Sequence, residues 1–299
     1  MTQIEDISEA DCKKLSTKIR ENIFKPVNTY KTTFILCGAD ITQKDKMRYK
    51  FSQALGGWWY SYQYDIFYPE DIFEELLYSS KTKDLLSLEN LLADSVDAVV
   101  IIPESPGSFA ELGAFANDEK LRNKLICIID KKYKKDKSFI NQGPLKLVKK
   151  ANKHGLIFID PDDIEKEVEN LCTSLKKMKK SSSKVSDKIT LLQLGNFLLP
   201  TIYLLEPVSK NTLINLVKNA TEDEVDPFQT TTIALTSLTK KRQVELTPTG
   251  YKLTALGVKD FLSFRKTSSR FKTQDKTVAI DELRLEILNL KNRKKKLKV

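Results

Sequence analysis

Residues 98–116 read AVVIIPESPGSFAELGAFA, and this stretch decides the fold that we expect for the first half of the chain. The five leading apolar residues do not alternate with polar ones, which predicts a strand buried on both faces, as in a parallel sheet. A loop with Pro and Gly follows, and then a helical pattern that carries one carboxylate, Glu111. Ligands of open parallel sheets bind beyond the carboxyl ends of the strands. We therefore expect a ligand site between Ser105 and Glu111.

Glu111 has two interpretations. The local one is a capping box, because Ser108 and Glu111 have the spacing at which a Glu side chain reaches back to the cap amide. The chemical one places the carboxylate in the first helical turn, where free amides and the helix dipole hold it as an anion. Such an anion can attack or stabilise an electron-poor sugar carbon. Gly107 would let the backbone, with its amide donors, approach that ligand.

Strands and helices alternate through the first half of the chain. Apolar runs predict further strands at 32–37, 64–68, 125–129 and 156–159. Helical patterns fall at 43–55, 71–78, 83–93 and 164–177, and Gly56-Gly57 is expected to end the first of these helices. This alternation predicts an α/β fold with a doubly wound parallel sheet over residues 31–175.

The composition narrows the class of protein. A chain of 299 residues with 40% hydrophobic and 30% charged side chains is typical of a globular protein of two domains. No stretch approaches membrane-spanning length and the N-terminus lacks a signal-peptide core, so we expect a cytoplasmic protein without a membrane partner. The four widely spaced cysteines are expected to be reduced core residues. With one histidine and no cysteine pairs, we expect no metal, and a catalytic unit of Ser-His or Cys-His type is disfavoured.

The second half of the chain changes character. Lysines and serines at 176–188 predict a linker, and 189–270 is expected to hold a smaller domain. Helices are expected at 189–205, interrupted at Pro200, and at 212–219 and 228–240, followed by a hairpin and a helix from Gly257. This order resembles a winged helix-turn-helix domain. Residues 1–30 form an expected helical arm, with either this chain or a neighbouring subunit as its partner. Residues 271–299 are expected to form a basic helix that ends in a flexible tail at 291–299.

Positive charge gathers in this second half. Residues 1–175 have a net charge of −3 and residues 176–299 a net charge of +13, which together make the +10 of the chain. A basic region of this kind meets polyanions such as nucleic acid, although a solvated basic face explains the charge equally well. The candidate nucleic-acid contacts are Lys240, Lys241, Arg242, Lys252, Arg293, Lys294, Lys295 and Lys296.

Residues 31–175 resemble the nucleoside 2-deoxyribosyltransferase family. The resemblance rests on FILCGA at residues 34–39, on Asp84-Leu85, and on the motif from Pro103 to Gly113. It implies that Glu111 is the catalytic nucleophile against C1′ of the sugar and that Asp84 contacts the base. A second base-contacting Asp of the family is missing, and Ser105 stands near its place. The implied substrate-binding residues are Cys37, Gly38, Ala39, Ser105, Gly107 and Ser108.

The loop SPGS at residues 105–108 also resembles the phosphate-cradling loops of nucleotide N-glycosidases. This likeness favours a nucleotide over a nucleoside as substrate. The combination of this domain with a winged-helix-like domain resembles the effector proteins of one class of bacterial retrons. That resemblance implies the toxin of an anti-phage defence system, with the retron reverse transcriptase and its branched RNA–DNA product as partners. It also implies N-glycosidase activity with NAD⁺ as substrate and, because family members often complete the site from a neighbour, a homo- or hetero-oligomer.

Three functions stay open at this point. In the first, Glu111 attacks or stabilises the ribose C1′ of NAD⁺ while nicotinamide leaves as a neutral base, and water completes hydrolysis. In the second, the α/β domain senses a nucleotide without cleaving it and the winged helix regulates DNA. In the third, the protein is a salvage deoxyribosyltransferase. The missing loop Asp and the basic second domain count against the third function.

Overall fold

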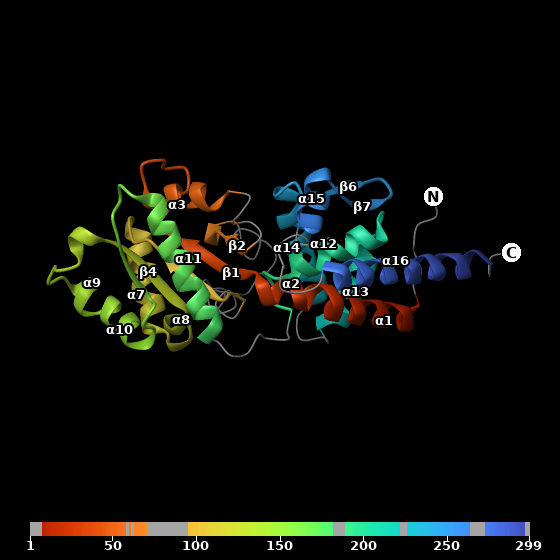
Figure 1. The fold of residues 1–299 in the computed structure, drawn as a ribbon, viewed down its shortest axis with the longest axis horizontal. Helices are drawn as coiled ribbons and strands as arrows, with labels where there is room; N and C mark the ends of the chain where they lie inside the picture. Colours follow the sequence, from red (N-terminus) through yellow and green to blue (C-terminus); the bar gives the residue numbers. More distant parts are fainter. Residues whose placement is uncertain are drawn as a thin grey trace. The chain divides into compact units, whose positions relative to one another are not determined.

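The computed structural model describes residues 8–57, 60, 63–70, 95–181, 189–221, 226–263 and 273–296. Contacts divide the chain into two units, which are drawn in Figure 1. One unit is continuous and comprises Lys31–Val185, here called the sheet unit. The other, here called the helical unit, joins both ends of the chain, Met1–Tyr30 and Ser186–Val299.

The sheet unit is built on five parallel strands, so the expected α/β architecture with a parallel sheet is confirmed. The strands are β1 (Thr32–Cys37), β2 (Tyr64–Phe67), β3 (Ala98–Ile101), β4 (Leu125–Asp130) and β5 (Leu156–Ile159). Their order across the sheet is β2-β1-β3-β4-β5, and every neighbouring pair is parallel. All of β1 and β3 is buried, as the continuous apolar runs predicted.

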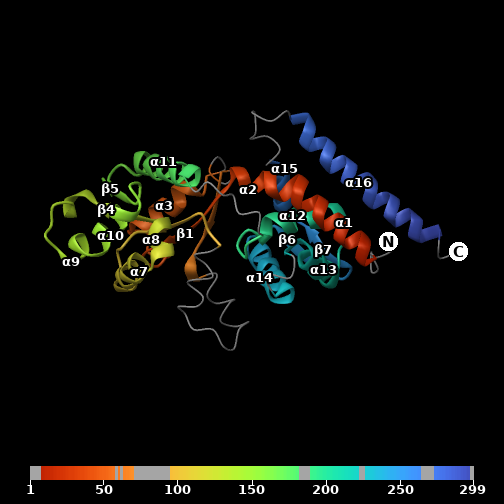
Figure 2. The same ribbon diagram turned by 90° about the horizontal axis from the view of Figure 1, so that it is seen from below.

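Helices cover both faces of this sheet. On one face, α3 (Met47–Leu55) and α11 (Ile164–Ser181) contact each other and share a core with alternate residues of β1, Phe34 and Leu36. The other face carries α7 (Pro106–Asn117), α8 (Glu119–Lys124) and α10 (Pro144–Ala151), which also contact one another. Figure 2 shows α11 and α7 on opposite sides of the strands. A short helical turn, η2 (Lys131–Tyr133), and α9 (Phe139–Gln142) lie between β4 and α10.

The helical unit contains the two ends of the chain. Its first segment is a nearly continuous helix made of α1 (Glu9–Ile19), a π-helical turn η1 (Arg20–Phe24) and α2 (Lys25–Tyr30). The C-terminal elements are α12 (Leu194–Leu205), α13 (Lys210–Thr221), α14 (Pro227–Lys240), the antiparallel hairpin of β6 (Val244–Thr247) and β7 (Gly250–Leu253), α15 (Ala255–Ser263) and α16 (Thr273–Lys296). The order of three helices, hairpin and helix is the order expected from the sequence.

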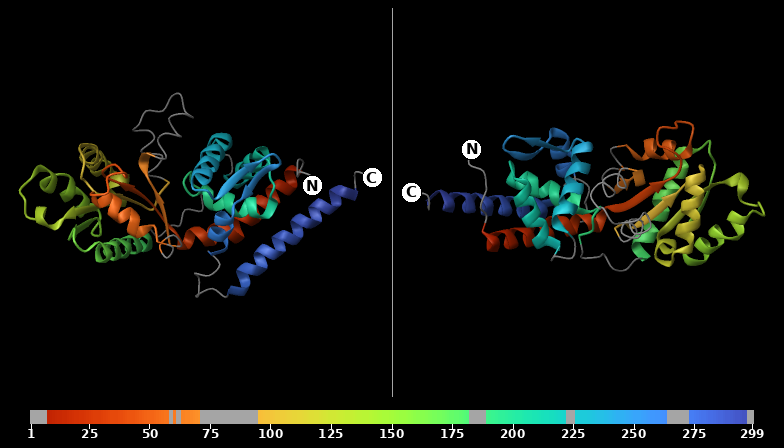
Figure 3. Two further views of the ribbon diagram at one scale, coloured as in Figure 1. Left: turned by 90° about the horizontal axis from the view of Figure 1, so that it is seen from above. Right: turned by 180° about the vertical axis from the view of Figure 1, so that it is seen from behind.

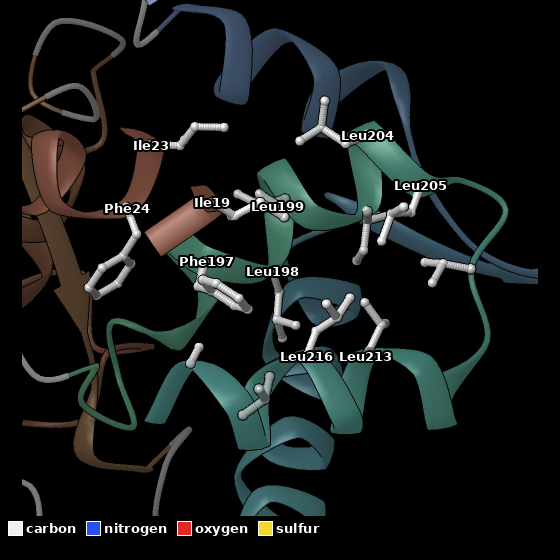
Figure 4. Packing of buried hydrophobic residues seen from close by; sticks show 14 of the residues in the cluster. Ile19, Ile23, Phe24, Phe197, Leu198, Leu199, Leu204, Leu205, Leu213 and Leu216 are labelled. Atoms are coloured by element: carbon white, nitrogen blue, oxygen red, sulfur yellow. The ribbon is translucent and has the colours of Figure 1, made fainter. Parts of the chain in front are cut away.

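The N-terminal helix completes the core of the helical unit. Leu15 is almost fully buried there. So are Ile19 and Phe24, which Figure 4 shows in one cluster with Phe197 and Leu216. The hydroxyl of Ser16 donates a hydrogen bond of 2.8 Å to the carbonyl oxygen of Leu216 in α13. The C-terminal helix α16 contacts η1, and Figure 3 shows α16 in two further views. The described part of the expected arm, residues 8–30, therefore packs on its own chain, an alternative that the sequence had left open.

Four expected boundaries are wrong. The helix α3 begins at Met47 rather than at 43. The helix α12 begins at Leu194 rather than at 189, and it continues through Pro200, beside which Thr201 bonds the carbonyl of Phe197 at 2.6 Å. The linker expected from 176 begins later, because α11 runs to Ser181 with Met178 buried in the sheet unit. The basic tail expected from 291 is helical as far as Lys296.

Several expected segments fall on residues that the structure does not describe. The helices expected at 71–78 and 83–93 lie outside the described residues, and so do 182–188 of the linker. All four cysteines are described and buried. Among the helices of the described ranges, none combines the length and the apolar character needed to cross a lipid bilayer.

Candidate functional site

The carboxyl ends of β1 and β3 meet at one edge of the sheet. The two strands are neighbours, and Cys37 at the end of β1 pairs with Ile101 at the end of β3. The chain leaves β1 to form β2 on one side of it and then β3 on the other side. In an open parallel sheet this reversal leaves a crevice between the two outgoing loops, where ligands bind. The loop that carries Ser105 and the start of α7 stand at this edge.

Ser105 caps α7, and this corrects the expected capping box. The Ser105 hydroxyl accepts a hydrogen bond from the amide of Ser108 at 3.3 Å, while the Ser108 hydroxyl accepts from the amide of Ser105 at 2.9 Å. The box is therefore Ser105 with Ser108, not Ser108 with Glu111. Because Pro106 is the first helical residue, Glu111 lies in the second turn of α7 and not in the first. Its carboxylate has no capping role at the helix N-terminus.

Glu111 stands at the border of the buried face of α7. Leu112 and Phe115 on that face are buried, whereas Glu111 is half-buried with its Oε2 atom enclosed. Side chains of an α-helix lean toward its N-terminus, over the residues three and four positions earlier. Glu111 is therefore directed back toward Ser108 and the loop at the sheet edge. A carboxylate placed in this way can act on a ligand held between the loops.

A buried arginine joins the loops of this edge, and sequence reasoning missed it. Arg48 in α3 is 3% exposed. Its guanidinium donates to the carbonyl oxygens of Leu36 and Ala39 at 3.0 and 2.8 Å, and to Glu70 at 2.8 Å. Arg48 thus ties the end of β1 to the segment after β2. A signal was present, because Arg48 lies on the helical stripe that also carries Phe51 and Leu55.

Glu104 makes the corresponding link from β3. Its carboxylate accepts hydrogen bonds from the amides of Met47 and Arg48 at 2.8 and 3.0 Å, which caps the N-terminus of α3. The amide of Glu104 in turn donates to the Ser108 hydroxyl at 3.0 Å. The loops after β1 and β3 are therefore held to each other through α3. Glu104 follows β3 closely in the sequence, but no sequence pattern near it indicates that its partners are the backbone amides of Met47 and Arg48.

The remaining implied ligand residues have mainly structural roles. The side chains of Cys37 and Ala39 are buried, and their carbonyl oxygens accept from the Ile102 amide and from Arg48. A Cβ atom at Gly38 would lie 2.9 Å from the carbonyl oxygen of Ile102, so packing alone requires glycine there. Ser108 is 1% exposed and its hydroxyl bonds within its own loop. These findings give the four residues structural roles, and their contact with substrate stays a prediction.

Gly107 and Asp40 remain accessible at the edge. Gly107 is exposed, and a Cβ atom there would meet nothing within 4 Å, so open space lies in front of the first turn of α7. Asp40 follows β1 and accepts hydrogen bonds from the amide and hydroxyl of Thr42, which lower the pKa of its carboxyl. Asp84 lies outside the described residues. Within the described ranges, no His, Cys, Asp and Glu side chains are grouped to hold a metal ion.

The candidate nucleic-acid residues of the helical unit fall into three places. Lys240, Lys241 and Arg242 are consecutive and exposed where α14 ends and the chain turns into β6. Lys252 lies in β7 directly opposite Glu245 of β6, so a carboxylate offsets its charge. The residues 293–296 lie in the last turns of α16.

Arg242 has an unusual backbone conformation. Its φ angle is +55°, in the left-handed region that disfavours every residue with a Cβ atom. The position directly follows the C-cap of α14, where glycine is the usual residue. The strain is of order 1–2 kcal/mol. An arginine is therefore kept at a position where glycine would cost less.

The exposed hydroxyls of α14 are occupied by their own helix. Thr230, Thr232 and Thr236 each donate to the carbonyl oxygen four residues earlier, at 2.7, 2.7 and 3.0 Å. Their protons are thus unavailable to base edges, and readout of base sequence ordinarily relies on Arg, Asn or Gln. The geometry of α14 disfavours sequence-specific readout through these threonines.

The chain is thus a protein of two units. One is an α/β unit with a carboxylate near the β1–β3 edge, and the other is a helical unit with a basic turn and a hairpin. Comparison with known proteins gives the family. Residues 44–246 match the family model of the STM3845 retron effector protein, and the chain belongs to this family of retron effectors.

Two relatives from Escherichia coli support this membership. A protein named "Retron Ec86 putative ribosyltransferase/DNA-binding protein" is 38% identical over 279 residues, which cover 89% of this chain and 87% of the relative. A Retron Ec73 protein of the same description is 33% identical over 135 residues, 44% of this chain and 43% of the relative. The expectation of a retron effector is confirmed.

Proposed function

We propose that this retron effector is a toxin of an anti-phage system that hydrolyses the N-glycosidic bond of a nucleotide, with NAD⁺ as the leading substrate. The observation that carries the proposal is the position of Glu111, in the second turn of the helix α7 that follows the loop at the β1–β3 edge. Open space in front of Gly107 supports entry of a ligand. The description of the relatives as ribosyltransferases agrees with chemistry at a sugar carbon.

The reaction needs little besides one carboxylate and water. The Glu111 carboxylate attacks or stabilises C1′ of the nicotinamide ribose through an oxocarbenium-like state. The N-glycosidic bond breaks, and its electron pair leaves with nicotinamide, which departs as a neutral base. Water then adds its oxygen to C1′ and loses a proton, giving ADP-ribose; where Glu111 has bonded to C1′, this step breaks that bond and its electron pair returns to the carboxylate. Asp84 would orient the base or a ribose hydroxyl, and the Ser105 loop would face the sugar and phosphates.

The helical unit would supply the connection to the rest of the retron. We propose a winged-helix-like fold for it because Val208 forms an antiparallel bridge with Tyr251, adding a third extended segment beside the hairpin. Lys240, Lys241 and Arg242 would then contact phosphates of the branched RNA–DNA product without reading its bases. The reverse transcriptase holding that product would be the protein partner. An oligomer that completes the site from a neighbouring subunit is part of the same proposal.

A product assay tests the enzymatic part. The full-length protein is incubated with NAD⁺, and separately with deoxynucleosides, with and without the reverse transcriptase and its RNA–DNA product. Released bases are identified by chromatography. We expect nicotinamide from the wild type and at least a hundredfold slower release from Glu111→Gln, because an amide neither attacks nor stabilises the cation.

Glu119→Gln is the matched control. This glutamate begins the neighbouring helix α8 and is exposed, so its substitution removes the same charge and should leave the rate unchanged. Equal NAD⁺ loss in Glu111→Gln and wild type would reject Glu111 as the catalytic residue. Exchange of deoxyribose between bases would indicate a salvage transferase. Tight nucleotide binding without turnover under every condition would indicate a sensor.

A further inference from the structure

The segment after β4 combines lysines with exposed aromatic rings, and the proposed function does not use it. Residues 131–139 read KKYKKDKSF and are all exposed. Phe139 is 84% exposed and Tyr133 is 49% exposed, whereas phenylalanine side chains are normally buried. This segment, here called the basic-aromatic loop, follows the carboxyl end of a parallel strand. It therefore leaves the same sheet edge as the candidate catalytic loops.

The charge of the basic-aromatic loop is local. Residues 131–139 contain five lysines and one aspartate, a net charge of +4. The other residues between 31 and 175 contain 15 basic and 22 acidic side chains, a net charge of −7. Such a local concentration of positive charge is suited to an anionic partner.

The loop has a defined conformation. The side-chain amide of Asn141 donates to the carbonyl oxygens of Tyr133 and Asp136, at 2.8 and 2.7 Å, and so ties two points of the loop together. Ser138 caps the short helix that begins at Phe139. A Cβ atom at residue 143 would lie 3.0 Å from the carbonyl oxygen of Phe139, so the tight turn after this short helix favours Gly143. The structure thus presents the ring of Phe139 to solvent from an ordered frame.

The lysines of the loop differ in their partners. Lys131 pairs with Asp160, and Lys132 pairs with Asp130 at 2.9 Å and lies over the Tyr133 ring. Lys134 lies over the Phe158 ring, 5.3 Å from its centroid. Lys135 and Lys137 flank Asp136 directly before the exposed ring. The positive charge nearest to Phe139 in sequence therefore comes from Lys135 and Lys137.

We propose that the basic-aromatic loop binds single-stranded nucleic acid, with Phe139 stacked on an unpaired base and Lys135 and Lys137 on the adjacent phosphates. Single strands are bound by this combination, because every base has a face that stacks on an aromatic ring and every nucleotide carries a phosphate. A duplex does not offer free base faces, and an acidic peptide does not stack. The site belongs to the sheet unit and is separate from the basic residues of the helical unit. A strand bound here would lie at the edge that carries Glu111.

A tryptophan reporter at the site tests the proposal directly. In full-length protein carrying Phe139→Trp, we expect oligothymidylate to quench the emission added by the new tryptophan, because a stacked base quenches indole fluorescence. A duplex of the same length and oligoglutamate should leave that emission unchanged. Leu147→Trp, at an exposed apolar position of α10, is the matched reporter and should respond to none of them.

Affinity measurements complete the test. They use a background of Lys240→Gln, Lys241→Gln and Arg242→Gln, which weakens the other basic surface, and they follow anisotropy of labelled oligothymidylate. Phe139→Ala should weaken binding roughly tenfold. Lys135→Gln with Lys137→Gln should reduce the slope of log affinity against log salt by about 1.4, whereas Lys149→Gln with Lys150→Gln on α10 should not.

Three results would overturn the proposal. They are unquenched emission of the Phe139→Trp reporter at saturating oligothymidylate, equal quenching by duplex or oligoglutamate, and an affinity unaffected by Phe139→Ala. Equal quenching by oligoglutamate would instead identify an acidic protein partner. None of these readouts depends on NAD⁺ cleavage, so failure here and failure of the glycosidase proposal are distinguishable.

Discussion

The two units differ in how their cores are assembled. The sheet unit uses one continuous stretch of chain, and its core comes from strands whose apolar runs are visible in the sequence. The helical unit joins residues from the two ends of the chain, so that Ile19 packs with Phe197. The comparison teaches that a local pattern suffices for the first kind of core. The second kind also needs a long-range docking step that no local pattern reveals.

The largest expected effect separates the two cores. Phe197→Ala should lower the free energy of unfolding of the helical unit by about 3–5 kcal/mol, because Phe197 is 0% exposed. Hydrogen exchange followed by mass spectrometry should then accelerate in α1, far away in sequence, as well as in α12 and α13. Ile126→Ala, equally buried in β4, should accelerate exchange in the strands and not in α1. Protection of α1 that survives Phe197→Ala would refute the shared core.

The second prediction concerns the edge of the sheet unit. Arg48→Met should lower the stability of this unit by about 2–3 kcal/mol, since it leaves two buried carbonyl oxygens without their donor. It should also slow any reaction at the β1–β3 edge because the loop after β1 loses its anchor. Denaturant unfolding and the product assay measure the two effects. Lys50→Met removes a charge from the same helix and should change neither; a silent Arg48→Met would mean that Glu104 alone holds the loops.

The third prediction uses the strained arginine of the helical unit. Arg242→Gly should raise the stability of this unit by about 1 kcal/mol, because glycine accepts the left-handed conformation without strain. Under the proposed function it should at the same time weaken nucleic-acid binding. Lys241→Gly removes the same charge at the C-cap of α14, where φ is −72° and glycine relieves no strain, and it should lower both stability and affinity. Thermal unfolding and anisotropy distinguish these variants, and a destabilised Arg242→Gly would contradict the strain argument.

The smallest expected effect lies between α1 and α16. Glu286 accepts hydrogen bonds from Lys14 and Lys18 at 2.7 and 2.5 Å, and they lower the pKa of its carboxyl below the ordinary value of 4.5. A lowered carboxyl pKa stabilises the fold above the ordinary pKa, and this contribution is lost as the pH falls through the lowered value. Because both lysines are largely exposed, we expect only about 0.5 kcal/mol.

The matched variants for this ion pair are Glu286→Gln and Glu282→Gln, both in α16. The first should remove a small acid-dependent part of the unfolding free energy of the helical unit between about pH 5 and pH 3. The second changes an exposed carboxylate and should leave that pH profile as it is. Identical profiles for wild type and Glu286→Gln would show that these lysines do not contribute to docking of α16.

Much of the fold could be predicted because its signals are local. The apolar run at residues 32–37 became β1 with those bounds, and Gly56 ends α3 as expected. Boundaries failed where tertiary contacts decided them. Met178 extends α11 into the expected linker because it fills the core, and Pro200 stays inside α12, where neighbouring residues are buried on all sides.

The candidate site was predictable only in part. Glu111 was found from its motif, but its position in the helix was misjudged. The sequence analysis started the helix near Ser108, whereas Ser105 is the N-cap. Ser105 and Ser108 form the capping box, and only the backbone geometry shows this. Arg48 and Glu104 were missed for a different reason. Their partners are backbone groups of other elements, and a backbone group leaves no residue-specific signal in the sequence.

By itself the sequence determined the parallel α/β layer, the carboxylate near its edge and the basic second half. Hydrophobic periodicity, motif spacing and charge depend only on residues that are close together in the sequence. Only the tertiary structure decided that the N-terminal helix belongs to the C-terminal unit, that Arg48 ties the loops of the sheet edge, and that Phe139 stands exposed among lysines. The first two depend on contacts between residues that are far apart in the sequence. The third depends on which side chains stay exposed after the core has packed. Local patterns cannot express either property.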